Sequence, residues 1–406
     1  MMELLAPAGG FEQLQYALHF GADAVYLGGE RFGLRVRANN FSDEQLAQAI
    51  ELVHGQGRRV HVTLNALMHE QDLAPLRSYV RLLGELGVDA VIVSDLAAIS
   101  IVQELAPDIE VHLSTQASCT NALAARRYHD LGVSRIVLAR ELSLAEIAEI
   151  RAQTPEGLEL EVFVHGAMCM AYSGRCLISA YLTGRDANRG HCTQPCRWHY
   201  ALEEEKRPGE FFPVEEDGRG TYLMNSKDLM MLDHLDELEA AGVDSVKIEG
   251  RVKGAYYIAT VVNAYRKVLD GADPRDLLPE LDAVSHRPYH TGFFFGPAEQ
   301  ACDESTYVQT HDWVAVVDSC EPTRPGSRLW RIEVTQRNRF FEGDELGVLT
   351  PRCPVFSVVV RELRDDEGLL CTSANRTLAR YSFTSPAPLA PHDILRRRRA
   401  DIHVKG

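Results

Sequence analysis

The stretch RVHVTLNALMHEQDLAPLRSYVRLLGELGVDAVIVSD, residues 59–95, decides the fold. It begins with an apolar, β-branched segment that is typical of a strand, and it ends with a second one, DAVIVSD. Between them, LAPLRSYVRLLGELG has apolar residues at helical spacing and closes on glycine, as helix ends commonly do. A strand, a helix and a second strand in this order predict a parallel βαβ unit.

The same unit recurs along the chain. Strand-like segments begin near residues 3, 23, 59, 89, 110, 135, 159 and 244, with helical patterns between them. Eight such units close most simply into a (βα)8 TIM-like barrel over residues 1–300, and a doubly wound open sheet is the alternative. A ninth candidate strand, TYLMNS at 221–226, leaves open whether it or DSVKIEG at 244–250 closes the barrel.

The pattern changes after Pro274. Segments such as WVAVVDS, RLWRIEVT and VFSVVVREL are short and β-branched, and turn residues rather than helices separate them. Residues 305–395 therefore predict a small all-β domain, either a barrel or a sandwich. Residues 396–406 begin with four arginines and predict a basic tail.

The formal net charge of −16 argues against a polyanionic partner such as RNA, but the charge is uneven. From Ser305 to the end there are 15 Lys and Arg residues against 13 Asp and Glu, whereas the rest of the chain has 27 against 45. The acidic excess therefore belongs to the barrel. Arg396 to Arg399 could contact phosphates, and a solvated terminal run is the alternative.

The sequence predicts a cytoplasmic protein that does not bind a membrane. No apolar run approaches the ~20 residues that would span a bilayer. The first residues, MMELLAPAGGFEQL, lack the pattern of a secretory signal. Because cytoplasmic thiols stay reduced, clustered cysteines there suit metal or redox chemistry better than disulfides.

Four of the nine cysteines lie in one loop, residues 166–200, after the seventh predicted strand. Cys169, Cys176, Cys192 and Cys196 follow the spacing C-x6-C-x15-C-x3-C. Thiolates are soft ligands that suit an iron–sulfur cluster or zinc, and only the last pair has the spacing usual for zinc. The spacing leaves iron–sulfur, zinc and unliganded thiols open. The scattered Cys119, Cys302, Cys320, Cys353 and Cys371 resemble small core residues.

Polar residues gather where the predicted strands end. In a βα barrel these ends share the face where active sites form, so their side chains should converge on one mouth. Such a cation-rich mouth would suit an anionic small molecule, unless the residues pair with one another as salt bridges at the rim. The candidates are Arg35, Arg37, Asn65, Gln116, Glu141, His165, Lys247, Glu249 and Arg251.

Several motifs together resemble the peptidase U32 family over roughly residues 3 to 300. They include EVFVHGAMCMAYSGRCLIS at 161–179, GADAVYLGG, LRVRANNF, HLSTQAS, GRDANRGHC, NSKDL, VKIEGRVK and HRPYHTGFF. Along the chain, these motifs occur in the same order as in that family. Within the family, the segment RPGEFFPVEEDGRGTYLMNSKDL at 207–229 is most similar to prephenate-dependent tRNA uridine hydroxylases, which form 5-hydroxyuridine at the wobble position.

The resemblance implies an enzyme that hydroxylates an RNA base without molecular oxygen, with tRNA and prephenate as its substrates. It also implies a [4Fe–4S] cluster on Cys169, Cys176, Cys192 and Cys196. Some relatives place a cluster cysteine after KDL, where this chain has Met230, so either Cys196 serves as the fourth ligand or the cluster is incomplete.

The implied substrates suggest roles for individual residues. Prephenate is a dicarboxylate, which Arg35, Arg37 or Arg251 could hold through paired hydrogen bonds. His165 and Glu249 could move protons, and Tyr172 could stack on a uracil that has left the anticodon stack. Plain loop packing is the alternative for Tyr172, and a supporting role beside a metal is the alternative for His165.

Proteolysis is the second functional class, because the family carries a peptidase label. The chain has neither an HExxH motif nor a GxSxG motif. Cys176 and His165 could form a nucleophile and base, but a thiol bound to a cluster cannot also attack an amide. Hydroxylation of an rRNA cytidine is the nearest alternative among RNA-modifying reactions, and a binding role without catalysis is a third possibility.

Overall fold

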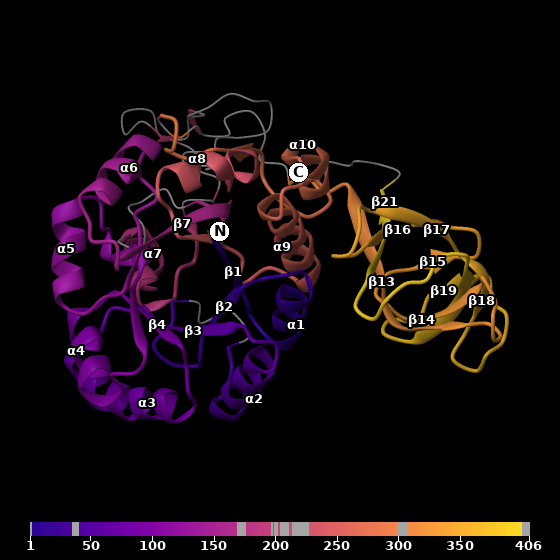
Figure 1. Cartoon of the computed structure of the whole chain (residues 1–406), viewed down its shortest axis with the longest axis horizontal. Coiled ribbons are helices and arrows are strands. Elements are labelled where there is room, and N and C mark those ends of the chain that lie inside the picture. The colour runs from indigo at the N-terminus through magenta and orange to yellow at the C-terminus, as the bar shows by residue number, and fades with distance from the viewer. Residues whose placement is uncertain are drawn as a thin grey trace.

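A computed structural model describes residues 2–34, 40–168, 176–195, 198, 202–203, 211–212, 227–296, 298 and 307–399. Eight parallel strands close into a barrel (Figure 1). They are β1 (Glu3–Pro7), β2 (Ala24–Leu27), β3 (Arg59–Leu64), β4 (Ala90–Val93), β5 (Glu110–Leu113), β6 (Arg135–Val137), β7 (Glu159–Ala167) and β11 (Ser245–Ile248). Strand β11 pairs in parallel with both β1 and β7, so the segment DSVKIEG closes the barrel. The competing segment, 221–226, lies outside the described residues.

Helices surround the barrel, as the alternating pattern predicts (Figure 1). They are α1 (Phe11–His19), α2 (Asp43–His54), α3 (Leu73–Glu85), α4 (Leu96–Leu105), α5 (Ala122–Asp130), α6 (Leu144–Ala152), α8 (Leu235–Ala240), α9 (Ala255–Leu269) and α10 (Pro274–Leu281). Local sequence fixes their starts. At α2, Gln45 N–H donates to the Ser42 hydroxyl at 3.2 Å, and Ser42 N–H donates to the Gln45 side chain at 3.0 Å. This reciprocal pair satisfies two donors that a helix start leaves unpaired.

Alternation along the strands separates two apolar layers. On β1, Leu4 and Ala6 join the large core under the helices, whereas Leu5 packs with Tyr26 and Ile92 in a separate small cluster. Successive side chains of a strand point to opposite faces, so the small cluster fills the barrel interior.

The barrel interior is charged on the side away from the carboxyl ends of the strands. Arg135, 2% exposed, contacts Glu3 at 2.5 Å, Glu159 at 2.7 Å and Glu161 at 3.2 Å. Glu161 also pairs with Lys247 at 2.8 Å. These groups lie at the starts and middles of their strands, away from the carboxyl ends. Removing one partner would leave a buried charge uncompensated, which is strongly destabilising.

Two buried histidines make the fold sensitive to acid. The rings of His61 and His112 lie 4.7 Å apart, and burial holds the pKa of each well below its usual 6.5. The unfolded chain therefore takes up protons that the folded barrel does not, so stability rises with pH across this window. We expect a constant melting temperature above about pH 6.5 and a steady fall below it, checked by thermal unfolding monitored by circular dichroism. A melting temperature that rises on acidification through this range would contradict the prediction.

A short sheet extends the end of β7. Strand β10 (Asp228–Met230) runs antiparallel to the last residues of β7, and β12 (Tyr289–His290) runs parallel to β10. The stretch between β7 and β10 is an insert, residues 168–227, that carries the cysteine-rich loop. Its described elements are α7 (Ile178–Thr183), a short 3-10 helix (Ala187–Arg189) and a small antiparallel pair, β8 (Leu202–Glu203) with β9 (Phe211–Phe212).

The C-terminal part is all-β, as predicted. Its main sheet has the order β17-β16-β21-β13-β14-β20-β18 and is antiparallel throughout. The strands of this sheet are β13 (His311–Pro322), β14 (Trp330–Gln336), β16 (Glu345–Leu349), β17 (Phe356–Val359), β18 (Arg361–Arg364), β20 (Arg380–Ser385) and β21 (Ile394–Arg398). A separate antiparallel pair is formed by β15 (Phe340–Phe341) and β19 (Ser373–Ala374).

The arginine run is not the start of a tail, contrary to the sequence prediction. Arg396 to Arg398 belong to β21, and Arg396 is 3% exposed and pairs with Glu280 of α10 at 2.7 Å. Arg397 pairs with Asp344 at 3.0 Å, and Arg399 pairs with Asp312 at 2.7 Å. Three of the four arginines therefore have acidic partners within the protein, which weakens the idea that the run contacts phosphates.

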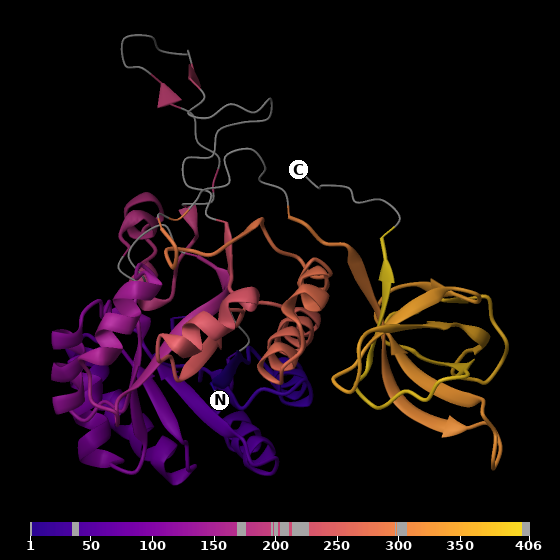
Figure 2. The ribbon, with the colours of Figure 1, turned by 45° about the horizontal axis from the view of Figure 1, so that its top comes forward.

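The two domains pack together on the α1 and α9 side of the barrel (Figure 2). The Trp313 ring stacks on Tyr256 of α9 at 6.2 Å and meets Tyr16 of α1 edge-on at 5.9 Å. Arg337 lies 4.6 Å above the Trp313 ring and forms an ion pair with Glu12. Aromatic packing combined with a cation–π contact and an ion pair resists separation, so we interpret the domains as one docked unit.

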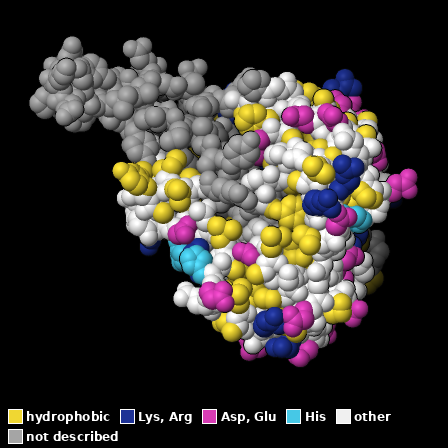
Figure 3. Space-filling view, turned by 90° about the vertical axis from the view of Figure 1, so that its left-hand side faces the viewer, with side chains coloured by type: hydrophobic (Ala, Val, Ile, Leu, Met, Phe, Trp, Pro, Cys, Tyr) yellow, Lys and Arg dark blue, Asp and Glu magenta, His cyan; other side chains and the backbone are white. Residues whose placement is uncertain are grey.

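The helical side of the barrel has a mixed surface, on which basic side chains lie beside acidic and hydrophobic ones (Figure 3). Ion pairs such as Arg77 with Glu104, 2.8 Å apart, connect neighbouring helices. Within the described ranges, no helix has the length and apolar character needed to cross a bilayer.

Candidate active site at the barrel mouth

The carboxyl ends of the strands hold a buried arginine. Arg251 follows β11 and is 4% exposed. Its Nη1 donates to Thr63 Oγ1 at 3.0 Å, and its Nη2 donates to Asn40 Oδ1 at 2.6 Å. A methyl group on Gly28 would lie 2.4 Å from Nη2, so glycine at this position makes room for the guanidinium. The planar group is fixed in place, which suits paired recognition of a carboxylate.

Asn65 directly follows β3, two residues after Thr63. Its Oδ1 accepts a hydrogen bond from Leu34 N–H at 3.3 Å, so the loop after β2 reaches across to β3. Arg35 and Arg37 fall in residues 35–39, outside the described residues. In the sequence they stand between Leu34 and Asn40, two residues that contact this part of the mouth.

Glu249 supplies a half-buried carboxylate on the same side of the mouth. The Tyr26 hydroxyl donates its one proton to the Ile248 carbonyl at 2.9 Å and, in a longer shared interaction, to Glu249 Oε2 at 3.4 Å. Lys247 lies deeper than predicted: its ammonium is buried, pairs with Glu161 and lies 4.5 Å above the Tyr26 ring. Glu249 therefore lies closer to the opening of the barrel than Lys247 does.

Two further candidates follow β5 and β6. Gln116 lies in a short 3-10 helix, Thr115–Ala117, whose start is capped by the buried Ser114. Glu141 comes four residues after the end of β6. Both side chains are half-buried at the carboxyl ends of their strands, so the structure places them at the same end of the barrel as Arg251 and Glu249.

His165 does not open onto the mouth. It is 1% exposed, and its ring lies 5.3 to 5.9 Å from the rings of Tyr257, Tyr265 and Tyr289. Burial lowers the pKa of His165 to about 3, so the ring is neutral at physiological pH. Enclosed on the α9 side of β7, it is better suited to packing than to the proton transfer that the sequence suggests.

Two of the four loop cysteines lie in the described part of the insert. Cys176 and Cys192 are half-buried, and neither forms a disulfide. Asn188 holds the first through hydrogen bonds with the Cys176 N–H and C=O, at 3.1 and 3.3 Å. The second accepts a hydrogen bond at Sγ from Gln194 N–H at 3.3 Å. Cys169, Cys196 and Tyr172 lie outside the described residues.

The cysteine segment is tied to the barrel mouth. Arg189 pairs with Asp72 at 2.9 Å, and Leu67 N–H donates to the Asn188 carbonyl at 3.3 Å. Leu67 lies in the loop after β3, the strand that also supplies Thr63 to the Arg251 site. The thiol segment and the arginine site therefore share the loop end of the same strand.

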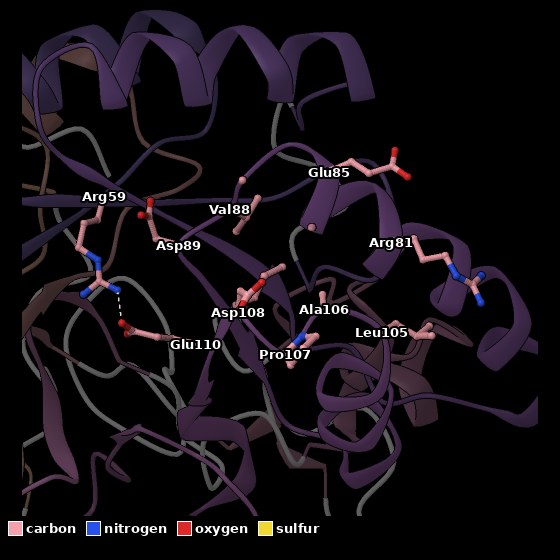
Figure 4. Close-up of a pocket in the computed structure, with 13 residues that line it drawn as sticks. Arg59, Arg81, Glu85, Val88, Asp89, Leu105, Ala106, Pro107, Asp108 and Glu110 are labelled. Carbon is pink, nitrogen blue, oxygen red and sulfur yellow. Dashed lines mark ion pairs between the residues drawn. The ribbon is translucent and has the colours of Figure 1, made fainter.

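A pocket of about 630 Å³ lies at the opposite end of the barrel (Figure 4). Its lining includes Asp89, Asp108 and Glu110, which stand at the beginnings of β4 and β5, and Arg59, which pairs with Glu110 at 2.7 Å. Since catalytic residues of βα barrels occupy the carboxyl ends of the strands, we do not assign the active site to this pocket.

Sequence reasoning missed the residues that support the site. Asn40, Thr63 and Asn188 hold Arg251 or Cys176 through side-chain hydrogen bonds. A signal for two of them was present, because LRVRANNF contains Asn40 and GRDANRGHC contains Asn188. Such neutral residues give no charge or metal-ligand pattern by which they could be selected from a single sequence.

The fold and the mouth together define a (βα)8-barrel protein with a polar site and a nearby cysteine-bearing segment, joined to an all-β domain. The sequence profile of peptidase family U32 matches residues 9–304, and that of the peptidase family U32 C-terminal domain matches residues 309–396. The chain belongs to peptidase family U32.

Several similar proteins carry names from RNA modification. The chain is 38% identical to tRNA hydroxylation protein P1 of Bacillus subtilis, over 97% of this chain and 94% of that protein. It is 38% identical to tRNA hydroxylation protein P of Escherichia coli, over 86% of each. It is also 40% identical to the 23S rRNA 5-hydroxycytidine C2501 synthase of Escherichia coli, over 66% of this chain but only 39% of that protein.

Proposed function

We propose that this protein hydroxylates the wobble uridine of tRNA to 5-hydroxyuridine, with prephenate as co-substrate and a [4Fe–4S] cluster as cofactor. The observation that carries the proposal is the similarity to tRNA hydroxylation protein P1, which extends over both domains and nearly the full length of each chain. Similarity that includes the β-domain favours a shared substrate more strongly than similarity of the barrel alone.

Prephenate would bind where Arg251 is held. Its guanidinium is fixed by Thr63 and Asn40, so little rotational freedom is lost when a carboxylate binds. Arg35 and Arg37, which flank this position in the sequence, are the candidates for the second carboxylate. Glu249, hydrogen-bonded to the Tyr26 hydroxyl, is placed to accept or return a proton at Oε2.

Cys169, Cys176, Cys192 and Cys196 would hold the cluster. The described pair fits this role, since neither cysteine forms a disulfide and an N–H group already donates to Cys192 Sγ, an interaction that tunes cluster potentials. A cytoplasmic location, which the sequence predicts, would keep the thiols reduced. When bound, the cluster would supply electron transfer or a polarising iron beside the mouth.

The uridine would leave the anticodon stack to reach the mouth, since its C5 atom must meet the reacting groups. Tyr172 is the candidate for stacking on the extruded base. Asn65, Gln116 and Glu141 offer amide and carboxylate groups that could read the edge of the uracil.

The alternative functions have weaker support. A Cys176 and His165 dyad for proteolysis needs an accessible imidazole, whereas His165 is enclosed by three tyrosines. For an rRNA cytidine, the similar synthase has extensive sequence beyond the 39% that this chain matches.

The proposal is tested with purified, anaerobically iron-loaded protein. We expect the protein to bind about four irons per chain and to form 5-hydroxyuridine in unmodified tRNA only when prephenate is added. Parallel reactions contain an rRNA fragment or denatured collagen. Hydroxycytidine in the rRNA, or cleavage of the collagen without any change to the tRNA, would replace the proposed function by one of the alternatives.

A further inference from the structure

The thiol-bearing insert leaves and rejoins the barrel at neighbouring positions. Strand β7 ends at Ala167, strand β10 begins at Asp228, and these two residues are directly paired in an antiparallel ladder. Leu229 pairs with Gly166 and Met230 with His165 in the same ladder. The insert is therefore anchored by two paired strand ends, residues 165–167 and 228–230, which we call its root. The orientation of this root sets the direction in which the insert leaves the barrel.

Arg140 holds the outgoing strand of this root. It follows β6, and its Nη1 donates to the Ala167 carbonyl at 2.9 Å. Its guanidinium also lies 5.2 Å above the ring of Phe163 on β7. The next residue, Met168, is 5% exposed and directly precedes Cys169 in the sequence. The chain is thus fixed up to the residue before the first cysteine of the loop.

Arg287 holds the returning strand. Its Nη2 and Nε donate to Asp228 Oδ1 at 2.7 and 3.1 Å, and its N–H donates to Asp228 Oδ2 at 3.1 Å. Both side chains are 4% exposed. Burial alone would raise the pKa of Asp228, but the guanidinium outweighs burial and lowers it, so the pair is ionised. A buried ion pair with three hydrogen bonds holds Asp228 in a single orientation relative to Arg287.

We propose that Arg140 and Arg287 are positioning residues that clamp the root of the insert and so fix the orientation in which its thiols face the barrel mouth. They touch neither substrate nor thiol in this role and act through the backbone of β7 and β10. The inference deepens the proposed function and rests on it, because it concerns how the cluster would be presented.

Strand β7 offers a matched control at its other end. Arg151 donates from Nη1 to the Leu158 carbonyl at 2.7 Å, one residue before β7 begins, and it also pairs with Asp244 at 3.5 Å. Arg140→Met thus removes an arginine-to-carbonyl hydrogen bond at the root. Arg151→Met removes hydrogen bonds to the carbonyls of Leu158, Thr154 and Pro155, away from the root.

The first test is hydrogen exchange of the metal-free protein, followed by mass spectrometry. Arg140→Met should speed exchange in peptides covering 165–168 and 228–231 by about tenfold, since a charged hydrogen bond is lost there. Arg140→Lys should restore slow exchange, and Arg151→Met should leave the root unchanged. Unchanged exchange in Arg140→Met, or equal loosening in Arg151→Met, would overturn the proposal. Arg287→Lys applies the same exchange test to the returning strand, provided that this variant folds.

The second test uses the iron-loaded protein and its electron paramagnetic resonance spectrum. Arg140→Met should alter the cluster signal or its iron retention, whereas Arg151→Met should change neither. A loosened root with an unaltered signal would show that the clamp does not position the thiols. Failure of wild-type protein to bind iron would contradict the proposed function instead, and exchange would still decide whether the arginines clamp the root.

Discussion

Cys192→Ser is expected to abolish iron binding and tRNA hydroxylation together. The Cys192 thiol is half-buried, forms no disulfide and already accepts a hydrogen bond from Gln194 N–H, as a cluster thiolate would. Serine is a poor ligand for iron in this role because its oxygen is hard and remains protonated near neutral pH. Iron content and product formation should both fall to background, measured by metal analysis and nucleoside mass spectrometry on the same preparation.

Cys353→Ser is the control for this prediction. Cys353 is exposed, and Lys267 Nζ donates to its backbone carbonyl at 2.7 Å, a bond that serine keeps. The control should retain full iron and full activity. Equal loss from the two substitutions, or one zinc per chain without iron after anaerobic reconstitution, would refute the assignment of the loop cysteines.

Arg251→Met should weaken prephenate binding severely. Truncating one side of a buried charge pair costs about 2 to 5 kcal/mol, or roughly 30- to 4,000-fold in affinity. The substitution removes the charge from a site where Thr63 and Asn40 hold the guanidinium in place. Isothermal titration with prephenate measures the loss, and thermal unfolding measures any damage to the fold.

Arg396→Met provides the comparison for Arg251→Met. Arg396 is likewise buried, but it pairs with Glu280 where the β-domain meets α10. Its replacement should lower the melting temperature and leave prephenate affinity unchanged. Similar losses of affinity in both variants would mean that Arg251 acts through stability and does not contact the ligand.

Most of the barrel could be predicted because its signals are local. Each strand and helix carries its own periodicity, and a regular alternation of the two has few closed solutions. The closing strand could not be chosen in the same way. TYLMNS and DSVKIEG are both short enough for a barrel strand, and only the pairing of β11 with β1 and β7, far apart in sequence, distinguishes DSVKIEG as the closing strand.

The sequence indicates which polar residues follow the strand ends, but it does not indicate how deeply each side chain is buried. Arg251, Asn65 and Glu249 lie at the mouth because parallel strands end at the same face. Lys247 and His165 are buried away from the mouth, and the geometry of their strands explains why. Lys247 points into the barrel toward Glu161, and β7 continues to Ala167, which carries His165 beneath the tyrosines of α9. Single-sequence patterns do not specify how far a strand extends or which groups meet it.

Charge runs were the least predictable feature. Four consecutive arginines resemble a basic tail by composition, yet Arg396 is buried in β21 against Glu280, a partner 116 residues away in the sequence. Composition cannot show such a partner, and pairing with it changes the expected role from phosphate contact to domain docking.

The most direct measurement is mass spectrometry of tRNA nucleosides from cells that carry or lack the gene for this protein. The proposal predicts that 5-hydroxyuridine disappears from tRNA when the gene is absent, and that it returns with wild-type protein or Cys353→Ser but not with Cys192→Ser. Unchanged 5-hydroxyuridine in cells without the gene and without another enzyme of this type would contradict the proposed function.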